Sequence, residues 1–223
     1  MLDWPGRVAT TIFLSGCSLR CPYCHNASLL KPTDQPLDWL DIVHHLEARR
    51  DWIDGVVVTG GEPTDDPDLP SLLTALKDAD VAIKLDTNGS NPLVLALLLA
   101  EGLVDAVALD VKAVPARYGE VAGARSISAQ VRECAQMLIG AGIEHEFRTT
   151  VFPGVIALDE LPRIARSLRG GRLYALQQFR PTATLDPKAL AVAPYDEESL
   201  RAAARACTRF LPTIVRGISR TED

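Results

Sequence analysis

Three cysteines stand close together near the start of the chain, in the stretch Cys17-Ser18-Leu19-Arg20-Cys21-Pro22-Tyr23-Cys24. Cysteine thiolates are ligands of zinc and of iron–sulfur clusters. A structural zinc site needs four ligands, usually as two separate pairs, and the sequence has no second Cys-x-x-Cys pair. Three thiolates can hold a four-iron cluster and leave one iron open to an external ligand. The spacing therefore favours a 4Fe-4S cluster bound by Cys17, Cys21 and Cys24.

The other two of the five cysteines are interpreted as core residues. Cys134 and Cys207 stand on helical patterns, far along the chain from the cysteine-rich stretch. A free cysteine of this kind usually packs as a small hydrophobic side chain. Two isolated cysteines cannot hold a second cluster, so the sequence predicts one cluster only.

Polar residues follow the other predicted strands, each time at the same end. Because the carboxyl ends of parallel strands meet on one rim of the fold, these residues are expected to form a single site. They are Thr59-Gly60-Gly61-Glu62-Pro63, Asp86-Thr87-Asn88-Gly89, Asp110-Val111-Lys112, Arg148, and Gln177-Gln178-Phe179-Arg180-Pro181.

Short β-branched and apolar runs alternate with helical stripes along the whole chain. This alternation predicts parallel βαβ units and an α/β fold. Six units are fewer than the eight of a closed barrel, so we expect a partial (β/α)6 TIM-like barrel, open on one side, as a single domain over residues 1–223. A doubly wound flat sheet is the alternative. The predicted strands are 10–14, 56–58, 81–85, 104–111, 146–152 and 173–179, and the predicted helices are 37–46, 69–76, 92–100, 129–139, 158–168 and 197–210.

Composition excludes several classes of function. The chain has 223 residues, 47% of them hydrophobic, and a formal net charge of −6, so no overall positive field attracts nucleic acid or acidic membranes. No apolar run reaches the roughly 18 residues that span a bilayer. The first residues do not have the pattern of a signal peptide. We therefore expect a soluble cytoplasmic protein with neither nucleic acid nor membrane as a partner.

The cysteine motif and Gly60-Gly61-Glu62-Pro63, taken with the polar strand ends, resemble the radical S-adenosylmethionine (SAM) enzymes. Within that superfamily the sequence resembles the activating proteins of anaerobic ribonucleoside-triphosphate reductase, which are close to pyruvate formate-lyase activating enzyme. The segments that carry this second resemblance are Leu2-Asp3-Trp4-Pro5-Gly6, Cys21-Pro22-Tyr23-Cys24-His25-Asn26, residues 85–92 and Leu109-Asp110-Val111-Lys112.

The resemblance implies a reaction and its partners. The open iron would bind the amino and carboxylate groups of SAM, and a reduced cluster would cleave SAM to methionine and a 5′-deoxyadenosyl radical. That radical would take a hydrogen atom from a glycine of a client glycyl-radical enzyme, expected to be anaerobic ribonucleotide reductase. Flavodoxin or a ferredoxin would supply the electron. The cofactor carries the chemistry, and the protein positions it.

The resemblance also implies which residues surround SAM, although several have simpler alternatives. Gly60 and Gly61 suit either an approach of bare backbone to the methionine amino group or an ordinary strand-to-helix turn. Glu62 suits the holding of that turn, and Arg148 either a contact to SAM or a structural ion pair. The expected cofactor-binding residues are Tyr23, His25, Asn26, Gly60, Gly61, Glu62, Asp86, Thr87, Asn88, Asp110, Lys112, Arg148 and Gln178.

Two of these residues raise the question of a cation. Asp86 and Asp110 end neighbouring predicted strands, and two close carboxylates repel unless a positive charge lies between them. Lys112 is one candidate for that charge. The resemblance to pyruvate formate-lyase activators favours an Na⁺ or K⁺ ion held by Asp86, Thr87 and Asp110, which suits all-oxygen ligands. The alternative is that both aspartates cap the turns that follow them.

Two other classes of function remain open from the sequence. One is a radical SAM enzyme that acts on a small molecule, such as a deazapurine-forming synthase. The other is a non-enzymatic iron–sulfur or zinc module.

Overall fold

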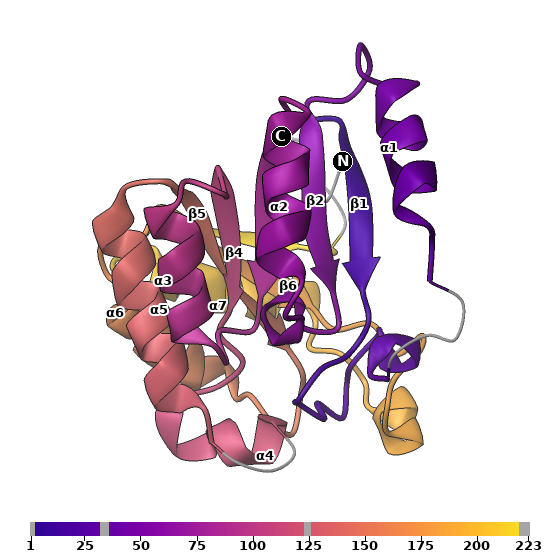
Figure 1. Ribbon diagram of the computed structural model, residues 1–223. Coiled ribbons are helices and arrows are strands. Elements are labelled where there is room, and N and C mark those ends of the chain that lie inside the picture. Colours follow the sequence, from indigo (N-terminus) through magenta and orange to yellow (C-terminus); the bar gives the residue numbers. More distant parts are fainter. Residues whose placement is uncertain (1–2, 32–35, 123–125, 219–223) are drawn as a thin grey trace.

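The computed structural model describes residues 3–31, 36–122 and 126–218. Leu2, which belongs to one of the motifs above, lies outside them. All seven strands are parallel, and they pair in the order of the sequence, from β1 to β7 (Figure 1). The strands are β1 (Ala9–Leu14), β2 (Gly55–Gly60), β3 (Ala82–Thr87), β4 (Ala106–Asp110), β5 (Glu144–Val151), β6 (Tyr174–Gln178) and β7 (Thr213–Arg216).

Helices connect successive strands, as parallel pairing requires. Helices α2, α3 and α5 cover one face of the sheet, which we call the outer face (Figure 1). Five-residue helix α4 was not predicted. The helices are α1 (Trp39–Glu47), α2 (Leu69–Asp78), α3 (Pro92–Ala100), α4 (Tyr118–Ala122), α5 (Ser128–Ala141), α6 (Leu161–Ser167) and α7 (Glu197–Cys207).

The predicted architecture is confirmed, with one addition. Strands that pair strictly in sequence order form a singly wound, barrel-like sheet, whereas a doubly wound sheet would reverse its order at one point. Within the described residues no pairing joins β7 to β1, so the barrel is open on that side. The addition is β7, whose four residues are too few for a sequence pattern to distinguish them from a loop.

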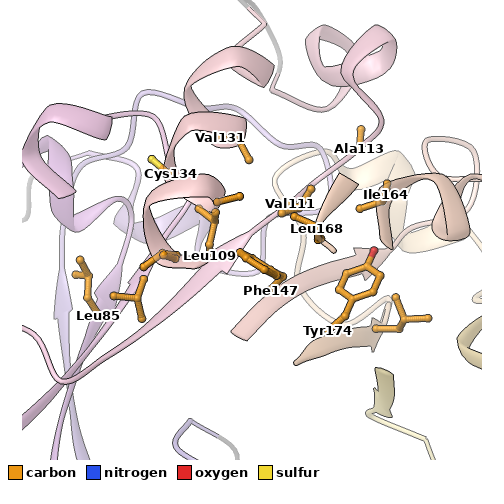
Figure 2. Packing of buried hydrophobic residues seen from close by; sticks show 14 of the residues in the cluster. Leu85, Leu109, Val111, Ala113, Val131, Cys134, Phe147, Ile164, Leu168 and Tyr174 are labelled. Atoms are coloured by element: carbon orange, nitrogen blue, oxygen red, sulfur yellow. The ribbon is translucent and has the colours of Figure 1, made fainter. Parts of the chain in front are cut away.

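Side chains alternate between the two faces of each strand, and the faces differ in chemistry. On β3 the residues Ile83 and Leu85 face the helices, while Lys84 and Asp86 lie on the opposite face, which we call the inner face. Leu85 packs in the same apolar core as Leu109 and Phe147, the latter two on β4 and β5 (Figure 2).

The register of the strands brings the polar strand ends together. Asp110 of β4 is the partner of Arg148 on β5, and Asp86 of β3 is the partner of Ala108 on β4. In Figure 1 the carboxyl ends of β1 and β2 point to the bottom of the view, where the loops of the candidate site begin. In the described part of the chain, no helix is both long enough and apolar enough to cross a bilayer.

Candidate cofactor site

A cavity of about 210 Å³ opens at the carboxyl ends of the strands. It draws residues from five strands or the loops that follow them, and it collects nearly every residue that the sequence predicted for the site. Of those, it is lined by Cys17, Cys21, Tyr23, Cys24, His25, Asn26, Gly60, Gly61, Glu62, Asp86, Thr87, Asn88, Asp110, Lys112 and Arg148.

Hydrogen bonds hold the cysteine loop in shape. The Cys24 amide donates to the Cys21 carbonyl over 3.0 Å, and the Arg20 guanidinium donates to the Cys17 carbonyl over 2.5 Å. The Ser18 amide donates to the Asp65 carboxylate over 2.9 Å, which ties this loop to the segment after β2. The three cysteines therefore face one cavity from a loop whose backbone is fixed by its neighbours.

Burial decides the protonation of the free thiols. It raises the pKa of Cys17 to about 11 and also raises the pKa of Cys21, so both are protonated at neutral pH in the free protein. A bound metal would have to displace those protons. Among the described residues, no three His, Cys, Asp or Glu side chains form a group that could hold a metal ion. A cluster differs from a single ion because its thiolate ligands bind different irons.

Gly60 and Gly61 are needed where the end of β2 passes the end of β1. Gly60 has a φ of +130°, and a Cβ there would lie 2.1 Å from the Leu14 carbonyl oxygen. A Cβ on Gly61 would lie 2.0 Å from the Gly16 carbonyl oxygen. The collision is thus with the chain itself. Both glycines also line the cavity, so the turn and the site depend on the same two residues.

Glu62 holds the ends of β2 and β3 together. Its side chain is buried and accepts hydrogen bonds from the Thr64 hydroxyl (2.5 Å), the Thr87 hydroxyl (2.6 Å) and the Asn88 amide (2.6 Å). It also accepts from the Thr64 amide and so caps the short turn Pro63–Asp65. Burial raises its pKa, against the effect of these hydrogen bonds. The predicted role of Glu62 in holding the turn matches this geometry.

Arg148 joins the two aspartates at the rim. Its Nη1 lies 2.8 Å from Oδ2 of Asp86, and its Nε lies 2.9 Å from Oδ1 of Asp110. Of these two aspartates, Lys112 pairs with Asp110, with 3.1 Å between Nζ and Oδ2. The positive charge between the carboxylates is therefore that of Arg148, where Lys112 had been one candidate. Burial alone would raise the pKa of Asp110, but Arg148 and Lys112 hold it at about 2.

Three residues of the loop after Cys21 have different surroundings. The Tyr23 ring is buried with its centroid 5.1 Å from that of Phe152, and its hydroxyl has no hydrogen-bond partner among the described residues. Nε2 of His25 lies 2.9 Å from the Arg180 carbonyl oxygen. The Asn26 side chain donates to the Gly60 carbonyl over 3.1 Å and links the loop to β2.

Among the expected cofactor-binding residues, Gln178 is the one that does not line the cavity. Its side-chain amide donates to the Tyr195 carbonyl over 2.6 Å, so it fastens β6 to the segment before α7. The cavity also includes Thr59, which was expected at this rim, and Leu19, Leu30 and Thr150, which were not predicted for the site. Thr150 could have been found, because it stands two residues after Arg148 and so lies on the same face of β5.

Comparisons with known proteins agree with this site. The radical SAM superfamily model matches residues 11–168. The chain is 28% identical over 219 residues, 96% of its length and 90% of the relative's, to a protein of Methanocaldococcus jannaschii named "Putative glycyl-radical enzyme activating enzyme".

Several solved structures resemble the fold, and these include two that are similar over most of this chain. Streptococcus suis SuiB, bound to its precursor peptide SuiA, superposes with a TM-score of 0.74 at 17% identity over 94% of this chain, which spans 49% of the SuiB chain. A domain of the pyruvate-formate lyase-activating enzyme of Bacteroides vulgatus superposes with a TM-score of 0.58 at 14% identity, over 73% of this chain and 99% of that domain. The family match and the cavity together show that this chain belongs to the radical SAM superfamily, whose enzymes use a 4Fe-4S cluster and S-adenosylmethionine.

Proposed function

We propose that this chain is an activase that generates a glycyl radical on a partner enzyme, namely anaerobic ribonucleoside-triphosphate reductase. One observation carries the proposal: Cys17, Cys21 and Cys24 share a single cavity with the polar ends of β2, β3, β4 and β5. The named relative in Methanocaldococcus jannaschii, which is matched over most of its length, supports the activase class.

The residues present fit a cluster and SAM. Cys17, Cys21 and Cys24 would hold the cluster and leave one iron for SAM. The unpaired hydroxyl of Tyr23 is a buried polar group beside the cavity that still needs a partner, and a bound nucleoside could supply one. When bound, the cluster and SAM supply the one-electron chemistry that produces the 5′-deoxyadenosyl radical.

The side chains around the cavity would bind and orient SAM. Lys112 and Arg148 offer cationic groups to its carboxylate, and both are fixed by Asp110. Gly60 and Gly61 present backbone to the cavity, at a turn where a side chain would collide with the neighbouring backbone. An Na⁺ or K⁺ ion at Asp86, Thr87 and Asp110 remains part of the proposal, although Arg148 already balances the two carboxylates and the Thr87 hydroxyl donates to Glu62.

The client would reach the cavity through the open side of the barrel. Phe13 on β1 and Ile214 on β7, the two edge strands, have 55% and 40% of their surface exposed. A glycine-bearing loop of the client would enter between these two edge strands. Flavodoxin or a ferredoxin would deliver the electron to the cluster.

The test begins with SAM cleavage. Protein reconstituted with iron and sulfide under anaerobic conditions is incubated with SAM and dithionite, and 5′-deoxyadenosine is measured. It is then co-expressed with anaerobic ribonucleotide reductase, and electron paramagnetic resonance is used to detect a glycyl radical on that partner. Both products are expected.

Two other outcomes would contradict the proposal in different ways. Formation of 5′-deoxyadenosine together with catalytic modification of a free purine, and no protein radical, would assign the enzyme to the small-molecule class. Failure to cleave SAM in protein with a full cluster would leave only a binding module.

A further inference from the structure

Seven charged side chains of alternating sign run across the inner face of the sheet. The nitrogen and oxygen atoms of adjacent members lie 2.6 to 3.4 Å apart. Each member except the two at the ends therefore has two neighbours of opposite charge. In order, the members are Arg216, Glu146, Lys84, Asp86, Arg148, Asp110 and Lys112. We call this set the ion-pair chain.

The ion-pair chain connects two cavities. Its last four members line the cofactor cavity at the carboxyl ends of the strands. Lys84 and Glu146 line a second cavity, of about 170 Å³, nearer the amino ends. Lys84, whose side chain is only 3% exposed, is the member next to the cofactor cavity that does not itself line it.

The amino-terminal segment covers this second cavity. Trp4 is 1% exposed, packs against Val57 and Ala106, and donates from Nε1 to the Glu144 carboxylate over 3.0 Å. Small residues make room for its ring, since a Cβ on Gly55 would lie 2.8 Å from Trp4 Cζ3. The carbonyl of Asp3, directly before Trp4, accepts a hydrogen bond from Lys84 Nζ over 2.5 Å.

Lys84 has partners on three sides. Nζ donates hydrogen bonds to the Asp3 carbonyl and to Glu146 Oε1 at 3.4 Å, and it forms an ion pair with Asp86 Oδ1 at 3.1 Å. Among the described residues Asp86 Oδ1 accepts no hydrogen bond, so the charge of Lys84 is what compensates this buried oxygen. The Asp86 carboxylate lies between Lys84 and Arg148, with one oxygen toward each.

We propose that Lys84 and Trp4 are positioning residues for SAM binding, although neither touches the cofactor cavity. Trp4 holds the Asp3 carbonyl over Lys84, Lys84 fixes the Asp86 carboxylate, and Asp86 in turn orients Arg148 in the cavity. The proposal rests on SAM binding in this cavity and is independent of which client the enzyme activates.

The physical reason is that a buried charge without its partner is costly, so its neighbours rearrange. If Lys84 loses its charge, Asp86 keeps Arg148 as its one ionic partner and draws the guanidinium away from Asp110. Groups within one ion-pair network respond together and not independently.

The test measures the affinity of cluster-loaded protein for SAM by equilibrium dialysis, without reductant or client. Lys84→Met keeps the length of the side chain and removes its charge. We expect its dissociation constant for SAM to rise about tenfold, which is at the low end of the effect of losing one interaction with a charged group, with iron content unchanged. The matched control is Lys77→Met, because Lys77 pairs with Asp105 at 2.6 Å on the outer side of the sheet. The control should bind SAM as the wild type does.

A second pair of variants tests the amino-terminal segment. Trp4→Leu should weaken SAM binding in the same direction, whereas Trp52→Leu, at a residue that is 79% exposed, should not. In the double variant Lys84→Met/Trp4→Leu, the loss of SAM-binding free energy should be smaller than the sum of the two single-variant losses, because both act through Asp86. The Trp4 variant also serves as the test if Lys84→Met does not fold.

A purely structural role predicts something else. Lys84→Met and Trp4→Leu would then melt at lower temperature than the wild type but bind SAM with unchanged affinity, and this result would overturn the proposal. Losses of affinity that add fully in the double variant would also contradict it, because they would show two independent effects. Neither outcome depends on the glycyl radical, so the proposed function is judged separately.

Discussion

The two faces of the central strands are both buried, but they differ in the kind of side chain that they bury. On the outer face, Leu85, Leu109 and Phe147 are fully buried and pack beneath the helices (Figure 2). On the inner face of the same strands, Lys84 and Glu146 are buried as well, at 3% and 6% exposed. The outer face buries apolar side chains, and the inner face buries charged side chains that neutralise one another.

The two faces therefore contribute differently to stability and to ligand binding. The outer face stabilises the fold through apolar area, which depends little on the orientation of any one group. The inner face stabilises it less, because the cost of desolvating charges offsets their attraction. In return, each charge holds its neighbour at a set distance, up to the groups that line the cofactor cavity. Changes on the outer face should therefore affect stability, and changes on the inner face should affect ligand binding as well.

The largest effect is expected from the cysteines, which also divide between the cavity and the helical layer. Cys17→Ala, Cys21→Ala and Cys24→Ala should each lose the cluster, because each removes one of three thiolate ligands. Cys134→Ala should keep it, since Cys134 is buried on α5 behind Gly89. The measurement is iron and sulfide content after reconstitution, with about four irons per chain in the wild type. A wild-type protein that instead takes up stoichiometric zinc and no iron would refute the cluster.

A large effect on stability is expected on the outer face. Phe147→Ala should lower the free energy of unfolding by about 3–5 kcal/mol, because it leaves a cavity in a fully buried apolar layer. Chemical denaturation measures this loss. SAM affinity at low temperature should stay close to that of the wild type. If Phe147→Ala weakened SAM binding as much as Lys84→Met, the distinction between the two faces would be lost.

A smaller, pH-dependent effect is expected on the inner face. Burial alone would raise the pKa of Glu146, but hydrogen bonds from Arg216 and the charge of Lys84 lower it. A lowered pKa gives stability that is present above the unfolded value of about 4.3 and is lost as the pH falls below it. Glu146→Gln should therefore be about 2 kcal/mol less stable than the wild type at pH 7.

The two proteins should approach equal stability as the pH falls through the lowered pKa of Glu146, because the wild-type carboxylate then becomes neutral as well. Urea denaturation across this pH range checks the convergence. A difference that stays constant with pH would show that the charge of Glu146 has no part in its effect.

The smallest effect is expected from the choice of monovalent salt. Replacing K⁺ by Na⁺, or by a bulky organic cation, should change the rate of SAM cleavage if an ion binds at Asp86, Thr87 and Asp110. The change should be small, because Arg148 already bridges the two carboxylates. Asp86→Ala and Asp110→Ala should weaken SAM binding and keep the cluster. Cleavage indifferent to the salt would leave Arg148 as the sole cation between them.

Sequence patterns were enough to predict the repeating strand–helix units, the rim at the carboxyl ends of the strands and most residues of the cavity. These features follow from local patterns. A strand or a helix shows its hydrophobic period within a few residues, and the carboxyl ends of parallel strands meet on one rim whichever helices connect the strands. For this reason the sequence predicted the cysteine motif at Cys17, Cys21 and Cys24. It also predicted the strand ends at Asp86 and Asp110.

Which charged and polar groups pair with one another depends on the tertiary structure. Arg148 could have met SAM or an aspartate, and the register of β3, β4 and β5 placed it between Asp86 and Asp110. Trp4 meets Glu144 across 140 positions of the chain. Such contacts depend on register and packing over the whole sheet, and no local pattern encodes them. Strand β7 was missed for a related reason, since its four residues become a strand only because the edge of β6 is there to pair with them.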